Sequence, residues 1–195
     1  MKKFIALIVF CLFFVLSCKE EKKKEVFKGT FLEVLSKATE LVKVESPSAI
    51  FAEADATVKD QAMTAEDFTG WKFIYWIDLH NSVIIEYKDS TFSNVTAMPE
   101  GIWQDWLITE PIKMTLVEAI HLMREANYDD VIKAGNVKRP LFPGSNEPYY
   151  IFGSEKFGHI FVGTISKTVT IDTFPEKKEN KNTKKKAKKK NKQGS

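Results

Sequence analysis

The stretch Trp71-Lys72-Phe73-Ile74-Tyr75-Trp76-Ile77 decides the fold class. Its aromatic and β-branched residues predict a strand that ends at the turn His80-Asn81. A second strand is expected over residues 82–87. The dipeptide Asp89-Ser90 is then expected to turn the chain into a short strand over residues 91–96. Three successive strands with tight turns predict an antiparallel sheet.

A helix and a weaker strand precede this meander. Thr30 and Glu33 have the spacing of a capping box, and Pro47 ends the apolar pattern that follows. The helical apolar positions are Phe31, Leu35, Ala38 and Val42. Residues 50–58 alternate and predict a strand, and the polar residues 59–70 are expected to connect it to the meander.

The same order of elements occurs again further along the chain. Thr115 and Glu118 form a second capping box, and Asn127 is the expected helix stop. The second set of apolar helix positions is Leu116, Ala119, Ile120 and Met123. Further strands are expected over residues 131–137, 148–152, 159–165 and 168–171. The two helix starts lie 85 residues apart, which predicts an internal duplication; two similar but unrelated α+β stretches are the alternative.

Three segments of the second half carry a resemblance to a known family. Residues 114–120, 149–151 and 160–169 resemble a PepSY-type module, which opens a helix on Ser/Thr-x-x-Glu-Ala and closes with a characteristic strand pair. Gly163 stands where that strand pair usually has Asp, and Lys167 stands where it usually has Gly. The resemblance covers residues 114–172 in sequence, and residues 30–96 only in the order of elements.

The resemblance implies a fold and a mode of action. It implies an α+β fold of two helix–strand–strand–strand repeats similar to the β-lactamase-inhibitor-like fold, with both helices on one face of an antiparallel sheet. The repeats are expected over residues 26–97 and 114–174, joined by a linker over residues 98–113. Modules of this class act by binding or inhibition, and no catalytic residue carries over from the family.

The N-terminus predicts export and a lipid anchor. Met1-Lys2-Lys3 precedes an apolar run over residues 4–16, which suits a signal peptide and is short for a membrane span. The sequence Val15-Leu16-Ser17-Cys18 resembles a bacterial lipobox, with Leu16 where a smaller residue is more usual. The resemblance implies cleavage after Ser17 and acylation of Cys18, whereas an ordinary secretory signal is the alternative.

This processing would place the protein in the cell envelope. The expected parts are a signal peptide over residues 1–17 and a charged tether over residues 18–25. In a cell with two membranes the lipid anchor would lie in the outer one. The expected partners are the membrane, through the anchor, and another envelope protein.

Charge is divided unevenly along the chain. The formal total is +3, yet residues 25–175 carry −9 and residues 176–195 carry +8. The Lys-rich tail over residues 175–195 is expected to be disordered and to contact anionic lipid or cell-wall polymer without binding nucleic acid specifically. A solubilising tail is the alternative. The lysines expected to contact polyanions are Lys184, Lys185, Lys186, Lys188, Lys189 and Lys190.

Residue types that could support catalysis or bind a metal lie far apart in the sequence. Cys11 would leave with the signal peptide, and His80, His121 and His159 lie 41 and 38 residues apart, so no metal site is expected. Asp129-Asp130 follows a helix end and is interpreted as a solvated pair. No catalytic residue and no cofactor is predicted, and an enzyme with a dispersed site is the less favoured alternative.

Two loops are candidate contact surfaces. Trp103 and Trp106 lie in the linker, where they would either contact a partner or fill the seam between the halves. Leu141 and Phe142 lie in a Pro-rich loop, where they would either contact a partner or fold back onto the sheet. The predicted function is a non-catalytic binding or inhibitory module, with an accessory subunit of an envelope complex as the alternative.

Overall fold

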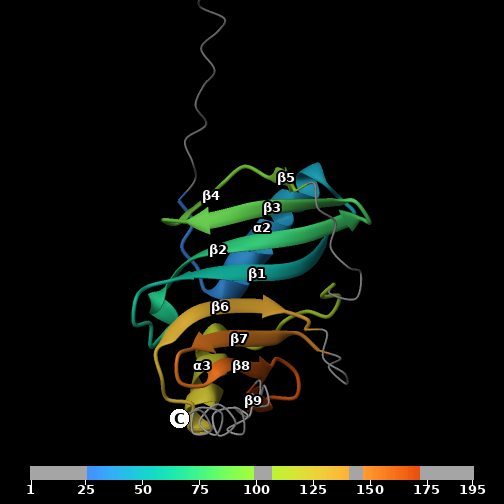
Figure 1. Cartoon of the computed structure of the whole chain (residues 1–195). Coiled ribbons are helices and arrows are strands. Elements are labelled where there is room, and N and C mark those ends of the chain that lie inside the picture. The colour runs from blue at the N-terminus through green and yellow to red at the C-terminus, as the bar shows by residue number, and fades with distance from the viewer. Residues whose placement is uncertain (1–25, 99–106, 141–146, 172–195) are drawn as a thin grey trace, which may run out of the picture.

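A computed structural model of the chain describes residues 26–98, 107–140 and 147–171 (Figure 1). These ranges contain two α-helices, one short 3₁₀ helix and nine strands. The helices are α2 (Phe31–Glu45), η1 (Ala65–Asp67) and α3 (Leu116–Glu125). The strands are β1 (Ile50–Val58), β2 (Phe68–Asp78), β3 (Asn81–Lys88), β4 (Thr91–Phe92), β5 (Thr96–Met98), β6 (Ile132–Lys138), β7 (Tyr149–Ser154), β8 (Gly158–Gly163) and β9 (Val169–Ile171).

All nine strands belong to one antiparallel sheet with the order β4-β3-β2-β1-β6-β7-β8-β9, and β5 pairs with β3. The predicted α+β class with an antiparallel sheet is therefore confirmed. The strands β1 and β6 join the two halves of the sheet through the register pairs Glu53–Lys138, Ala54–Val137 and Asp55–Asn136. In each half a helix precedes three longer strands, while the predicted repeat arrangement and a common origin of the halves stay predictions.

Local chemistry sets the ends of both helices. The Thr30 N–H donates to Glu33 Oε2 at 2.7 Å, and the Glu118 N–H donates to Thr115 Oγ1 at 3.1 Å. Both contacts satisfy N–H groups that a helix start leaves unpaired. Asn127, which follows the C-cap residue Ala126 of α3, has a φ of 65°, in the left-handed region that asparagine tolerates, and so ends the helix as predicted.

Both helices pack on the same face of the sheet, behind the strands in Figure 1, and one hydrophobic cluster joins them to it. The buried residues of α2 are Phe31, Val34, Ala38 and Val42, and those of α3 are Leu116, Ala119, Ile120 and Met123. Trp71, Phe73 and Tyr75 of β2 belong to the same cluster. Fully burying a large apolar side chain contributes about 1.5–3 kcal/mol, so this cluster is the main source of stability.

Three expected boundaries differ from the structure. The connector over residues 59–70 contains η1, and β2 already begins at Phe68. The strand expected over residues 91–96 is two short strands, β4 and β5, because the chain leaves the edge of β3 between them. The strand expected over residues 159–165 ends at Gly163, where a turn containing Lys167 (φ 58°) leads into β9.

Candidate functional site

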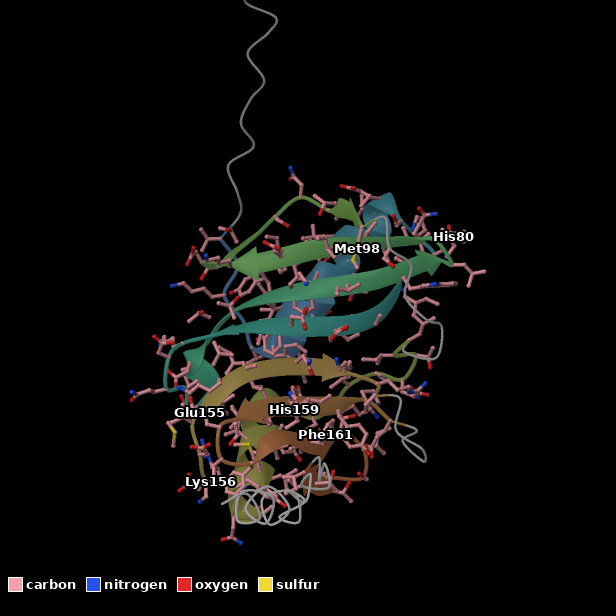
Figure 2. The ribbon with its side chains drawn as sticks, in the orientation of Figure 1. His80, Met98, Glu155, Lys156, His159 and Phe161 are labelled. Atoms are coloured by element: carbon pink, nitrogen blue, oxygen red, sulfur yellow. The ribbon has the colours of Figure 1, made fainter. Side chains whose placement is uncertain are left out.

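The face of the sheet opposite the helices, called here the second face, is the first candidate site. Side chains alternate along a strand, so Lys72, Ile74 and Trp76 of β2 point away from the helices. Cross-strand register places Glu53 beside Ile74, and Asp55 beside Lys72, on this same face. No helix of the described residues lies over the second face, which is turned toward the viewer in Figure 2.

Two ion pairs occupy the middle of the second face. Lys138 Nζ lies 3.3 Å from Glu53 Oε1, and Lys72 Nζ lies 3.1 Å from Asp55 Oδ2. The Glu53 side chain is 19% exposed, and this burial raises the pKa of its carboxyl while the Lys138 ammonium opposes the rise. The Asp55–Lys72 pair has side-chain exposures of 41% and 42%. Acidic and basic groups therefore alternate where the two halves of the sheet meet.

Aromatic residues flank these charges. In the second half, Phe161 lies 6.4 Å from Tyr149 and 6.5 Å from His159, measured between ring centroids, and both contacts are edge-to-face. Phe161 itself is buried, whereas His159 is exposed and Tyr149 is half-buried. Figure 2 labels His159 and Phe161 on β8. In the first half, Trp76 is half-buried beside the cross-strand residue Ser82.

A groove on the helix side is the second candidate site. Its volume is about 630 Å³, within the usual range for small-ligand sites. The starts of α2 and α3 both line it, and Figure 1 shows the two helices running away from each other from this point. The lining residues that matter for recognition are the aromatic Phe31, Phe68, Trp71 and Tyr87 and the acidic Glu66 and Asp89.

The aromatic residues that line the groove contact one another and are held in place by neighbouring groups. The Trp71 ring lies 4.4 Å from the Phe31 ring and stacks on the Phe68 ring at 5.8 Å. Phe68 in turn covers Gly135, where an added Cβ would lie 2.6 Å from the Phe68 ring. The Tyr87 hydroxyl donates to the Phe27 carbonyl at 3.0 Å, which holds the other wall in place.

The residues that the sequence singled out for anchoring or contact lie outside the described residues. They are Ser17, Cys18, Trp103, Trp106, Leu141, Phe142, Lys184, Lys185, Lys186, Lys188, Lys189 and Lys190. Their roles stay predictions. The described ends of the linker are anchored, because Leu107 and Ile108 are buried and the Ile108 N–H donates to the Phe51 carbonyl at 2.9 Å.

The adjacent acids Asp129 and Asp130 have separate structural partners. Asp129 pairs with Arg124 at 2.9 Å. Asp130 accepts from the Ser154 hydroxyl at 2.6 Å and from the Lys156 N–H at 3.0 Å, and these bonds lower the pKa of Asp130 to about 2. Each carboxylate is thus used in a local turn.

The described histidines occupy different parts of the fold. His80 lies at the β2–β3 turn and His159 on β8, as Figure 2 shows, while His121 pairs with Glu125 on α3 at 3.3 Å. Within the described residues no group of three or more His, Cys, Asp or Glu side chains could hold a metal ion. Among the same residues, no helix has the length and apolar character needed to cross a membrane.

Comparison of the chain with protein-family models, with curated proteins and with solved structures finds no match. Both candidate sites therefore depend on geometry. Sequence reasoning missed the groove, because Glu66, Phe68, Tyr87 and Asp89 come from separate strands and turns. The second face could have been found from the sequence, because Lys72, Ile74 and Trp76 occupy alternate positions of the strongest predicted strand and so share one face.

Proposed function

We propose that this chain is a lipid-anchored protein of the bacterial envelope that acts without catalysis by binding another protein through the second face of its sheet. One observation carries the proposal. Both helices pack on one face of the sheet, and the opposite face carries aromatic and charged side chains across both halves of the sheet.

The composition of the second face supports recognition of a protein. Aromatic side chains are enriched at protein interfaces, and their amphipathic rings supply much of the binding energy there. Trp76 and Tyr149 are half-buried and His159 is exposed, so each keeps surface for a partner. The pairs Glu53–Lys138 and Asp55–Lys72 would fix the orientation of that partner through charge complementarity.

The lipid anchor would place this binding at a membrane. Acylation of Cys18 would hold the body at a membrane, since each buried CH₂ contributes about 0.8 kcal/mol. The residues after Cys18 would then connect the anchor to a body whose first described residue is Val26.

Site-specific photocrosslinking in cells tests the proposal. A photoreactive amino acid is placed at His159 or Thr170 on the second face, and at His121 or Lys43 on the helix side as matched exposed controls. We expect one protein to crosslink to both second-face positions, and this product to be absent at both control positions. Equal crosslinking from the two sides, or crosslinking only from the helix side, would contradict the proposal.

A further inference from the structure

The groove between the starts of α2 and α3 presents one sign of charge beside aromatic rings. Glu66 and Asp89 are exposed carboxylates at its edge. Among the described residues that line it, none is a lysine, arginine or histidine. The charged lining therefore favours a cation.

The helix starts do not reverse this preference. The positive end of a helix dipole attracts anions, but a carboxylate in the first turn offsets that field. Glu33 lies in the first turn of α2 and accepts the Thr30 N–H, and Glu118 lies in the first turn of α3. The Glu33 carboxylate therefore offsets the field at the start of α2. At the start of α3 the Thr115 hydroxyl accepts the Glu118 N–H, and the Glu118 carboxylate pairs with Lys167 Nζ at 2.8 Å.

The aromatic walls suit the same class of ligand. Phe68 and Tyr87 are half-buried and keep part of their rings accessible, while Phe31 and Trp71 form the buried floor. A cation within about 6 Å of an aromatic face is attracted by the ring quadrupole, and more strongly once it is desolvated. The methylene groups of lysine or arginine can lie along apolar surface while the charged end reaches a carboxylate.

We propose that this groove binds a basic side chain, lysine or arginine, presented by a peptide segment of another protein. The ammonium or guanidinium group lies between Glu66 and Asp89, and its methylene groups pack on Phe68 and Tyr87. The volume of about 630 Å³ accommodates such a side chain with its flanking backbone. This site lies on the helix side and is independent of binding at the second face.

Fluorescence anisotropy with labelled peptides tests the proposal on the full chain. The probe is a six-residue Gly/Ser peptide with one central lysine, compared with the same peptide carrying norleucine or glutamate. The double variant Glu66→Gln/Asp89→Asn is expected to weaken lysine-peptide binding at least fivefold. The matched control Glu86→Gln/Asp60→Asn removes the same charge from exposed acids outside the groove and is expected to change binding less than twofold.

A second pair of variants, one that blocks the groove and one control, leaves its acids unaltered. Val117 lines the groove and is 62% exposed, so Val117→Lys tethers an ammonium there, whereas Val44→Lys makes the same change at a 78% exposed position of α2 outside it. We expect Val117→Lys to abolish lysine-peptide binding and Val44→Lys to preserve it, with unchanged melting curves. Two outcomes would overturn the proposal. In one, the norleucine or glutamate peptide also binds and Val117→Lys removes that binding. In the other, the lysine peptide binds only after residues 176–195 are deleted.

Discussion

Lys138 Nζ lies 3.3 Å from Glu53 Oε1 across the junction of β6 with β1. This contact joins two residues 85 positions apart in the chain and ties the halves together on the second face. Burial raises the pKa of Glu53, and the Lys138 ammonium is the largest influence that lowers it. The contribution of this ion pair to the stability of the protein therefore depends on pH.

We predict that Lys138→Met raises the pKa of Glu53 further and destabilises the protein more at pH 7 than at pH 4. A carboxyl whose pKa is raised on folding contributes most below its unfolded pKa of about 4.5, and loses that contribution as pH rises through the folded pKa. The expected loss at pH 7 is about 1 kcal/mol. Carboxyl NMR titration and urea melts at both pH values measure these changes.

Lys72→Met is the matched control, because the Asp55–Lys72 partners are 41% and 42% exposed. Water screens such a pair, so the expected loss is under about 0.5 kcal/mol. Equal losses for the two variants, or a loss that is independent of pH for Lys138→Met, would contradict the role assigned to Glu53.

A second prediction concerns the close approach of β6 to the start of β2. A Cβ on Gly135 would lie 2.6 Å from Cε1 of Phe68. Gly135→Ala is therefore expected to destabilise the protein by about 1–3 kcal/mol, as overpacking does elsewhere. Denaturant unfolding of Gly135→Ala, Phe68→Leu and the double variant measures the coupling.

The smaller leucine leaves room for the added methyl group, so the double variant should be more stable than the sum of the single effects predicts. Strict additivity of the two substitutions would show that the Phe68 ring is not what excludes a Cβ at this position.

The third prediction is that residues 26–97 do not fold alone. The strand β1 pairs with β2 on one side and with β6 on the other, so the fragment would expose a β1 edge in the middle of the sheet. It would also divide the single hydrophobic cluster that both helices share. Circular dichroism melts should show no cooperative transition for the fragment, and a transition matching that of the intact chain would refute this.

Local chemistry made most of the fold predictable. The capping residues Thr30 and Thr115 and the stop at Asn127 act within a few positions of the chain, and each is placed correctly. The alanine-rich residues 50–58 predicted only a weak strand, yet β1 lies in the middle of the sheet, and its Ala54 is fully buried in the hydrophobic cluster that both helices share.

Other features depend on contacts between distant residues. The pairing of β1 with β6 and the groove at the helix starts bring together residues tens of positions apart. The short strands β4 and β5 are set by the edge of β3, so the apparent continuity of residues 91–96 was misleading. No local pattern contains this information.

The fourth prediction concerns the anchor. Cys18→Ser removes the thiol that would receive lipid, so the variant should leave the membrane fraction or accumulate as an uncleaved precursor. Fractionation and mass spectrometry of the N-terminus measure this, with Cys11→Ser as the matched control that keeps Cys18. Acylated, membrane-bound Cys18→Ser protein would contradict the proposed lipid anchor.

The fifth prediction concerns the Lys-rich tail. Within the described residues the hydrophobic cluster ends at Ile171, so deleting residues 176–195 should leave the melting temperature nearly unchanged. The deletion should weaken binding to anionic vesicles, because each lysine near such a surface contributes about 1 kcal/mol. Since salt shortens the Debye length to about 3 Å at 1 M, the difference between the two chains should vanish there.

A melting temperature that falls by several degrees would show that the lysines dock on the acidic body. Vesicle binding that persists in molar salt would show that a specific pocket, and not Coulombic attraction, holds the anion.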